Sequence, residues 1–326
     1  MSIDTIRLSI GTAIVLGLKK GALPVPPTTA YMMVGSECVN NCAFCTQARD
    51  AVGNADMLSR VIWPAFAEDE VLEALGRVEG TGLSRICLQC LIDPTAMSEL
   101  PGTVKRLRTA SELEVSVSIS AVDNEMLSKL KEAGTDRIGI ALDGASEQVF
   151  DRIKGKGVGN PYSWEGNWRS LGSALEIFGK GKVSTHIIVG IGETDRDIID
   201  VLSRCREIGI LASLFAYTPM KGTKDIGPPP ELSRYRSMQI ARALIMEKGE
   251  TEGFRFDPSG KLTGLPLNRT EHDLDLGRVF MTRGCPDCNR PYYNERPRGP
   301  MYNYPRRLRS EEWERAFEEA MSYIEN

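Results

Sequence analysis

Three cysteines lie close together near the start of the chain, as Cys38-x3-Cys42-x2-Cys45. Such tight spacing favours metal ligation over a disulfide framework. Three thiolates from one loop can bind three irons of a cubane [4Fe–4S] cluster, which leaves the fourth iron without a protein ligand. An iron of this kind can take a small molecule, so the spacing predicts a substrate-binding cluster. Phe44, directly before the third cysteine, is an aromatic side chain that can lie against an adenine.

A structural zinc ion or a set of redox thiols is the alternative for these three cysteines. Structural zinc is normally held by four protein ligands, and the triplet supplies only three. Chemistry based on histidine is not expected, because the chain contains two histidines. One of them, His272, stands between two acidic residues and is expected to be exposed.

Four further cysteines form two pairs far apart in the sequence, Cys87-x2-Cys90 and Cys285-x2-Cys288. Together they supply four thiolates, the full set for a second cubane cluster. Side chains alternate along a strand, so both members of the first pair cannot point inward from a regular strand. We therefore expect Cys90 where its strand turns into a loop. Zinc in the same four-thiolate cage, or two pairs that never meet, are the alternatives. The eighth cysteine, Cys205, falls on the apolar face of a predicted helix and is expected in the core.

The elements that must position these cysteines alternate between strands and helices. Strand-like apolar runs cover residues 29–34, 85–88, 114–120, 137–142, 183–189 and 211–217. Helical periodicity marks residues 71–78, 126–130, 171–178 and 198–208 between them. Six such units predict an α/β fold with an open or partial (β/α)6 TIM-like barrel, rather than a Rossmann sheet. The cysteine triplet follows the first strand, at the end where barrel enzymes carry their chemistry.

The rest of the chain divides around this barrel. We expect a helical N-terminal extension over residues 1–28, the barrel over 29–225, and a C-terminal extension over 226–326 that closes the barrel mouth. The extension should hold a helix ending near residue 248 and a final helix over 311–324. The apolar run 8–18 is interpreted as a packing helix rather than a targeting segment.

The composition is that of a globular protein, with 41% hydrophobic and 26% charged residues. The net charge of −4 gives no case for nucleic acid or an anionic membrane as partner. No run reaches the roughly 20 apolar residues that a membrane span needs. We expect a cytoplasmic protein.

The segment Cys38-Val-Asn-Asn-Cys42-Ala-Phe-Cys45 resembles the CxxxCxxC signature of radical S-adenosylmethionine (SAM) enzymes. The resemblance implies that the open iron chelates the amino and carboxylate groups of SAM. One electron then releases methionine and a 5′-deoxyadenosyl radical, which abstracts hydrogen from the substrate.

Other motifs over residues 29–225 support this resemblance. Residues 187–194 resemble the GxIxGxxE motif of the fifth strand, with His186 in place of its first glycine, which implies SAM contacts for Gly190 and Glu193. Asp143 lies in a segment similar to the LDxxS of biotin synthases, which implies a ribose contact; a helix cap is the alternative. Tyr217 begins a segment similar to one after strand six of biotin synthases and is a further candidate for SAM binding.

Biotin synthases also place a ligand of a second cluster in an Arg-x-Cys segment that Cys87 matches. The tail from Cys285 to the Tyr-Asn-Tyr-Pro at residues 302–305 resembles most closely one component of the two-protein lipoyl synthases of archaea and some bacteria. This resemblance implies sulfur insertion into an octanoyl chain on a lipoyl carrier protein or peptide, with a sacrificial auxiliary [4Fe–4S] cluster. It also implies a paralogous radical SAM partner and a low-potential electron donor.

Two other functions stay open from the sequence: a radical SAM enzyme whose second cluster relays electrons or anchors substrate, and a non-catalytic zinc protein. The tail is basic, and an acidic carrier protein can dock on it electrostatically. The alternative to such docking is that these residues form a solvated basic surface or internal ion pairs. The tail's basic residues, opposed by Glu295, are Arg290, Arg296, Arg298, Arg306, Arg307 and Arg309.

Overall fold

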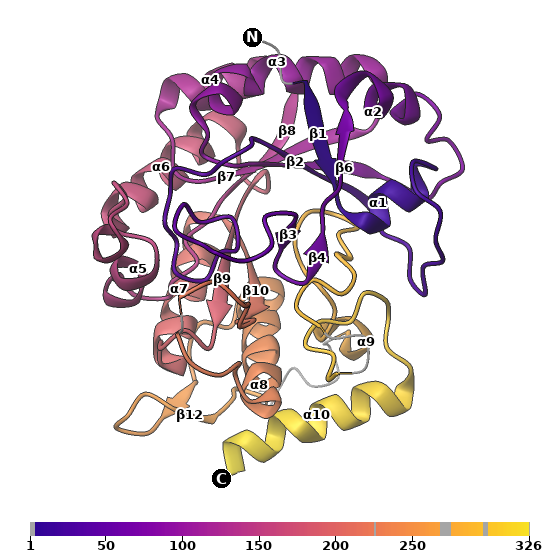
Figure 1. The fold of residues 1–326 in the computed structure, drawn as a ribbon. Helices are drawn as coiled ribbons and strands as arrows, with labels where there is room; N and C mark the ends of the chain where they lie inside the picture. The colour runs from indigo at the N-terminus through magenta and orange to yellow at the C-terminus, as the bar shows by residue number, and fades with distance from the viewer. Residues whose placement is uncertain (1–3, 225, 268–274, 296–298, 326) are drawn as a thin grey trace.

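The computed structural model describes residues 4–224, 226–267, 275–295 and 299–325. Six parallel strands form the centre of the molecule, each paired in register with the next (Figure 1). They are β2 (Thr29–Val34), β6 (Arg85–Cys90), β7 (Glu114–Ile119), β8 (Thr135–Ile140), β9 (Val183–Val189) and β10 (Leu211–Ala216).

The sheet continues beyond β2 with two antiparallel strands, β1 (Thr5–Leu8) on β2 and β5 (Ala65–Ala67) on β1. The order is β10-β9-β8-β7-β6-β2-β1-β5, so β10 and β5 are its two ends among the described strands. The predicted partial barrel is therefore confirmed, with an open side between its two end strands, β10 and β5. Two short hairpins lie outside it, β3 (Met57–Leu58) with β4 (Val61–Ile62), and β11 (Arg255–Phe256) with β12 (Leu262–Gly264).

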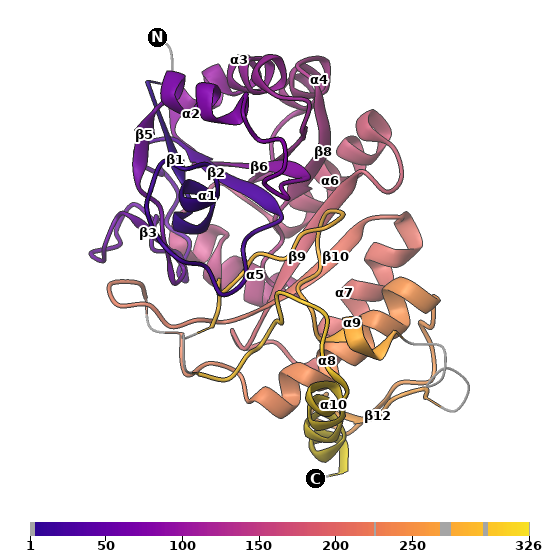
Figure 2. The same cartoon turned by 90° about the vertical axis from the view of Figure 1, so that its right-hand side faces the viewer.

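Helices cover the outside of the parallel strands (Figure 2). They are α2 (Glu68–Leu75), α3 (Pro94–Ala110), α4 (Asn124–Glu132), α5 (Glu147–Ile153), α6 (Trp164–Phe178) and α7 (Asp195–Ile208), with a 3-10 turn at Lys156–Val158. Because helices shield one face and the barrel interior the other, parallel strands are buried on both sides. All six residues of β2 are buried, for example.

The remaining helices lie at the two ends of the chain. Near the start is α1 (Ile10–Val15). In the C-terminal extension, α8 (Leu232–Ala243) continues into a π-helical segment (Leu244–Lys248) and packs against α10 (Ser310–Glu325), with the short α9 (Leu276–Val279) beside them. In the part of the chain described, no helix has the length and apolar character of a membrane span.

The predicted strands agree closely with the structure, and two of them, β2 and β9, match at both ends. The N-terminal segment differs, since Leu8 ends a strand and the helix is confined to Ile10–Val15. The described part of this segment, residues 4–28, is thus only partly helical and adds a strand to the sheet. Helices α3 and α5 were not predicted.

The C-terminal extension follows the open side of the barrel instead of only covering its mouth. Asn289 accepts a hydrogen bond from the backbone N–H of Thr28, which precedes β2. Farther along, the Asn294 side chain donates to the carbonyl oxygen of Ala216, at the end of β10. The tail therefore connects the start of β2 with the end of β10 and runs from the amino end of the strands to their carboxyl end.

Candidate active site

The cysteine triplet lies in the loop after β2, at the carboxyl end of the parallel strands as predicted. The loop lines a cavity with about 1150 Å³ of empty space, its open mouth included. A backbone hydrogen bond of 2.8 Å from Ala43 to the carbonyl of Ile153 ties the loop to α5. Seven predicted site residues line the cavity together: Cys38, Cys42, Phe44, Cys45, Cys90, Asp143 and Tyr217.

The sulfur atoms of the triplet have the surroundings of metal ligands. Burial raises the pKa of Cys42 to about 12 and that of Cys45 even further. A buried thiol of this kind stays protonated near neutral pH unless a metal displaces the proton. Two N–H groups face the sulfurs, from Asn160 at 3.6 Å to Cys42 and from Gln47 at 3.4 Å to Cys45. These donors and the three thiols fit an iron–sulfur cluster.

In the described residues, no three His, Cys, Asp or Glu side chains converge on one point as ligands of a single metal ion do. A cubane differs from a single ion, because each of its thiolates binds a separate iron.

Asp143 is a buried carboxylate on the cavity wall, with a left-handed φ of +64°. Lys154 Nζ lies 2.6 Å from one of its oxygens and His186 Nε2 lies 2.8 Å from the other. Burial alone would raise the pKa of Asp143, but the charges of Lys154 and His186 outweigh burial and hold the pKa well below its usual range. Two carboxylate oxygens have about four acceptor sites, so Lys154 and His186 leave room for a ligand hydroxyl.

Gly190 and Glu193 have a structural part in this geometry. The Glu193 carboxylate accepts backbone hydrogen bonds from Gly190 at 2.8 Å and Ile191 at 2.9 Å, and Arg234 pairs with it at 2.9 Å. Neither residue is among those that line the cavity. The two residues predicted as SAM contacts therefore shape the loop after β9, because the carboxylate is used on backbone N–H groups of its own turn.

A second group of sulfurs lies inside the barrel. Cys87 on β6 is the register partner of Tyr31 on β2 and of Ser116 on β7. The tail cysteines reach these two neighbours, with Cys288 Sγ 3.3 Å from the Tyr31 hydroxyl and Cys285 Sγ 3.4 Å from the Ser116 hydroxyl. The structure thus brings three cysteines together from segments about 200 residues apart.

Cys90 is not part of this group. It is the last residue of β6, three positions after Cys87, so it points to the opposite face. Its sulfur lies 3.2 Å from the carbonyl oxygen of Leu91 and 3.8 Å from the sulfur of Met97 on α3. The four predicted ligands therefore do not converge. The three that do are named here the thiol trio: Cys87, Cys285 and Cys288.

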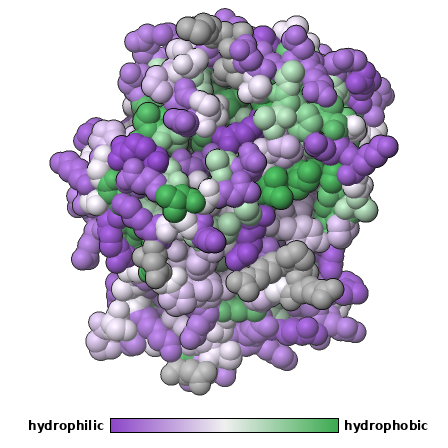
Figure 3. Space-filling view, viewed as in Figure 1, coloured by the Kyte–Doolittle hydropathy of each residue, from purple (hydrophilic) through white to green (hydrophobic). Residues whose placement is uncertain are grey.

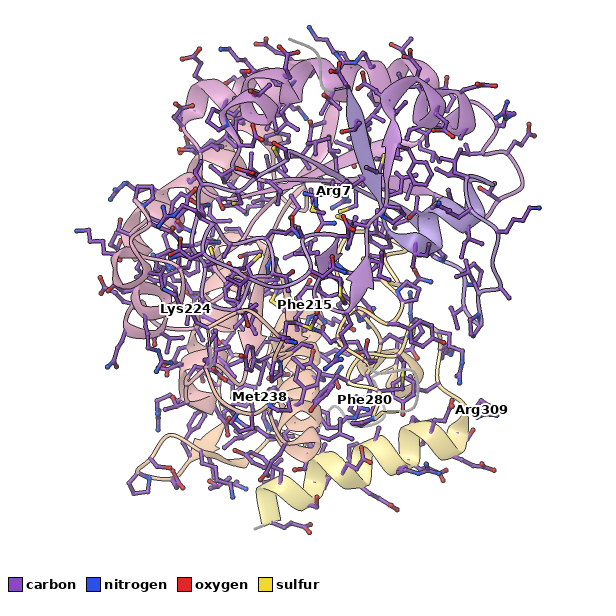
Figure 4. The ribbon with its side chains drawn as sticks, viewed as in Figure 1. Arg7, Phe215, Lys224, Met238, Phe280 and Arg309 are labelled. Carbon is purple, nitrogen blue, oxygen red and sulfur yellow. The ribbon has the colours of Figure 1, made fainter. Side chains whose placement is uncertain are left out.

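The thiol trio lies one layer below the cavity. Met33, Gln89 and Ser118 are register partners on β2, β6 and β7, two residues after Tyr31, Cys87 and Ser116 respectively. Gln89 and its two partners line the cavity. Two residues along a strand span about 7 Å, so the trio is close under the cavity floor. Figure 4 shows Phe215, another cavity residue, near the centre of the molecule.

Sequence reasoning missed several residues of the site. Strand alternation can identify Gln89 and Ser116, because they share the face of Cys87. Lys154 and Asn160 carry no such signal, since both reach the site from the irregular segment after α5. Cys205 is buried on α7, as expected.

Three of the four tail arginines in the described residues form ion pairs within the molecule. Arg306 and Arg309 contact Glu312, and Arg307 contacts Asp275. The internal ion pairs considered as an alternative are thus present for these three. Arg296, Arg298 and His272 lie outside the described residues. Figure 3 shows mainly polar side chains on the face viewed, with apolar ones gathered at the right at mid-height.

A partial six-stranded parallel barrel with a cysteine triplet after its first strand defines the class of radical SAM enzymes. The family model described as "Radical SAM superfamily" matches residues 32–205, more than half of the chain, and the chain belongs to this superfamily. The superfamily implies a [4Fe–4S] cluster and SAM, which the triplet and its cavity fit.

Among curated proteins, the chain is 25% identical to a biotin synthase of Sulfurihydrogenibium sp. over 62% of this chain and 58% of that protein. It is 26% identical to a biotin synthase of Persephonella marina over 59% of this chain and 56% of that protein. The chain thus spans a little over half the length of these relatives. The crystal structure of methylornithine synthase shares the fold, with a TM-score of 0.55, 18% identity, and coverage of 67% and 62% of the two chains.

Proposed function

We propose that this radical SAM enzyme inserts sulfur into an unactivated C–H bond, using a second [4Fe–4S] cluster held by the thiol trio. The observation that carries the proposal is the layer of Cys87, Tyr31 and Ser116 directly beneath the cavity floor, with both tail cysteines joined to it. A sulfur source at this depth is near any substrate carbon that reaches the base of the cavity.

When bound, the first cluster supplies the electron that cleaves SAM and the second supplies the inserted sulfur. The protein's own residues bind and orient the reactants. Asp143 accepts a hydrogen bond from a ribose hydroxyl, while Lys154 and His186 keep it ionised. Phe44 and Tyr217, which line the cavity, give the nucleoside apolar surfaces.

The substrate we propose is an octanoyl chain on a lysine of a lipoyl carrier protein, as in one component of a two-protein lipoyl synthase. The cavity favours such a chain because Met33, Ile188 and Phe215 give its wall apolar surface. A paralogous radical SAM enzyme then makes the second insertion, and a low-potential donor supplies electrons. A cytoplasmic location is part of the same proposal.

The test is anaerobic incubation of the reconstituted enzyme with SAM, a reductant and an octanoylated carrier peptide. We expect mass spectrometry to find sulfur added to the peptide and 5′-deoxyadenosine released. Replacing Cys285 and Cys288 with Ala should abolish sulfur addition and retain SAM cleavage. Cys90→Ala is the matched control and should retain both. Loss of SAM cleavage in the Cys285/Cys288 variant, or the absence of sulfur in the native product, would contradict the proposal.

A further inference from the structure

Arg290 is a cation set between the thiol trio and the cavity. Its backbone N–H donates to the Tyr31 hydroxyl at 2.6 Å, and its Nη2 donates to Gln89 Oε1 at 2.9 Å. The guanidinium lies 3.8 Å from the ring centroid of Tyr293 and 5.5 Å from that of Phe215. Arg290 is therefore held on three sides. Tyr31 on β2 binds its backbone, Gln89 in the cavity floor binds its guanidinium, and Tyr293 of the tail packs against the guanidinium.

No aspartate or glutamate of the described residues forms an ion pair with Arg290. Other deeply buried cations have such a partner: Lys154 has Asp143, Arg236 has Glu319 and Arg242 has Glu247. The Nε–H of Arg290 is in addition buried without a hydrogen-bond partner. A buried charge without a counter-charge is strongly unfavourable, so the site requires an anion that accepts a hydrogen bond.

The nearest groups able to supply that anion are the thiols of the trio. Cys288 Sγ and the Arg290 N–H share the Tyr31 hydroxyl as a partner, at 3.3 Å and 2.6 Å. Cys87 lies two residues before Gln89 on the same face of β6, and Gln89 holds the guanidinium. A cluster bound to these cysteines brings thiolate and sulfide, both anionic acceptors, to the unpaired N–H.

The backbone around Arg290 is held in an unusual conformation. Asp287, Arg290 and Tyr292 have left-handed φ values of 61°, 31° and 60°. Residues other than glycine rarely adopt such values. Such residues persist where the surroundings enforce them, often at functional sites. The tail thus gives up favourable backbone geometry to bring Cys288 and Arg290 to the same point.

We infer that Arg290 is the counter-charge of the second cluster: it donates its free N–H to cluster or thiolate sulfur and sets the cluster's reduction potential. This inference rests on the proposed function, since it requires a cluster on the thiol trio. Arg290 is a positioning residue for the sulfur donor. A fixed cation next to a cluster stabilises the reduced, more negative form, so it raises the potential.

The test measures the potential of the second cluster alone. In a full-length background with Cys38, Cys42 and Cys45 replaced by Ala, the midpoint is followed by electron paramagnetic resonance during a redox titration. We expect Arg290→Gln to lower the midpoint and Arg290→Lys to leave it near the parent value. The matched control is Arg306→Gln, which removes the same charge from an exposed ion pair with Glu312 and should leave the midpoint unchanged.

Each result separates the inference from the proposed function. If the parent contains no cluster, the proposed function fails at that point. If the cluster is present and its midpoint potential is the same in Arg290→Gln as in the parent, the role of Arg290 as counter-charge is contradicted. Loss of the cluster in Arg290→Gln with retention in Arg290→Lys supports a role of charge. Equal loss in both variants points to shape alone and overturns the inference.

Discussion

At the scale of single residues, the sequence motifs predicted the cavity well where a motif names the residue. Phe44, Asp143 and Tyr217 share one cavity with the cysteine triplet. Lys154 was not predictable, because a single lysine after a short helix belongs to no sequence motif. Its position in the site depends on its ion pair with Asp143. Gly190 and Glu193 were found by their motif, but the motif does not state whether they contact a ligand or support the loop.

The Asp143–Lys154 pair gives a prediction about stability. Lys154→Met leaves a buried carboxylate with only His186 as partner, and breaking a buried pair in this way costs about 3–5 kcal/mol. The double variant Asp143→Asn/Lys154→Met should lose less, because no unpaired charge remains. Urea unfolding of the metal-free protein measures both. A cost below about 1 kcal/mol for Lys154→Met would show that the pair is not buried as described.

Glu295 gives a prediction about pH. Burial raises its pKa from 4.5 to about 7, even though backbone N–H groups of Asn303 and Asn294 donate to it. The folded state therefore binds this proton more tightly than the unfolded state, and the free energy of unfolding should fall as pH rises from about 4.5 to about 7. The contribution is on the order of 3 kcal/mol. Unfolding measured across this window should show the decline in the native chain.

Glu295→Gln is the control, since an amide does not titrate. The difference in unfolding free energy between the native chain and this variant should vary with pH over the same window. A difference that stays constant with pH would contradict the raised pKa.

At the scale of elements, the strands were predictable because strands buried on both faces appear as continuous apolar runs. Helix α3 was not, since Pro94, Pro101 and Gly102 within it are ordinary signals of a helix break. In the structure Pro94 is the first residue of the helix. Its missing N–H has no cost there, because the first N–H groups of a helix have no partner within the helix. The Asp93 carboxylate completes this start by accepting from the N–H groups of Thr95 and Ala96.

The loop after β9 gives a prediction at this scale. Gly190 has a φ of +98°, and an added Cβ would lie 2.7 Å from Pro230 Cδ. Gly190→Ala should therefore cost more than the roughly 1–2 kcal/mol of the strained φ alone, and it should weaken SAM binding by displacing the loop. Gly17→Ala is the control, with a φ of +75° and open space around the Cβ. Equal costs in urea unfolding for the two variants would show that the contact with Pro230 is unimportant.

At the scale of the whole molecule, the barrel was predictable and the route of the tail was not. From their spacing alone, four cysteines were candidates for the second site. Because side chains alternate along β6, Cys90 points away from Cys87 and lies beside Met97 instead. The position of Cys285 and Cys288 depends on packing between segments far apart in sequence, such as Asn294 against Ala216. No local pattern encodes such contacts.

Iron content tests this arrangement. With two cubane clusters, the reconstituted native chain should contain about eight irons. Replacing all three residues of the thiol trio with Ala should leave about four, and Cys90→Ala should retain about eight. Chemical iron analysis with Mössbauer spectroscopy gives these values. A fall to about four in Cys90→Ala would place that cysteine among the ligands.

The source of the inserted sulfur is the most direct measurement of the central claim. The clusters are assembled with heavy-isotope sulfide, free sulfide is removed, and one turnover is run with SAM, reductant and an octanoylated carrier peptide. We predict heavy sulfur in the peptide, with heavy sulfide lost from the second cluster and the first cluster intact. A thiolated peptide that carries only light sulfur would contradict a sulfur donor on the thiol trio.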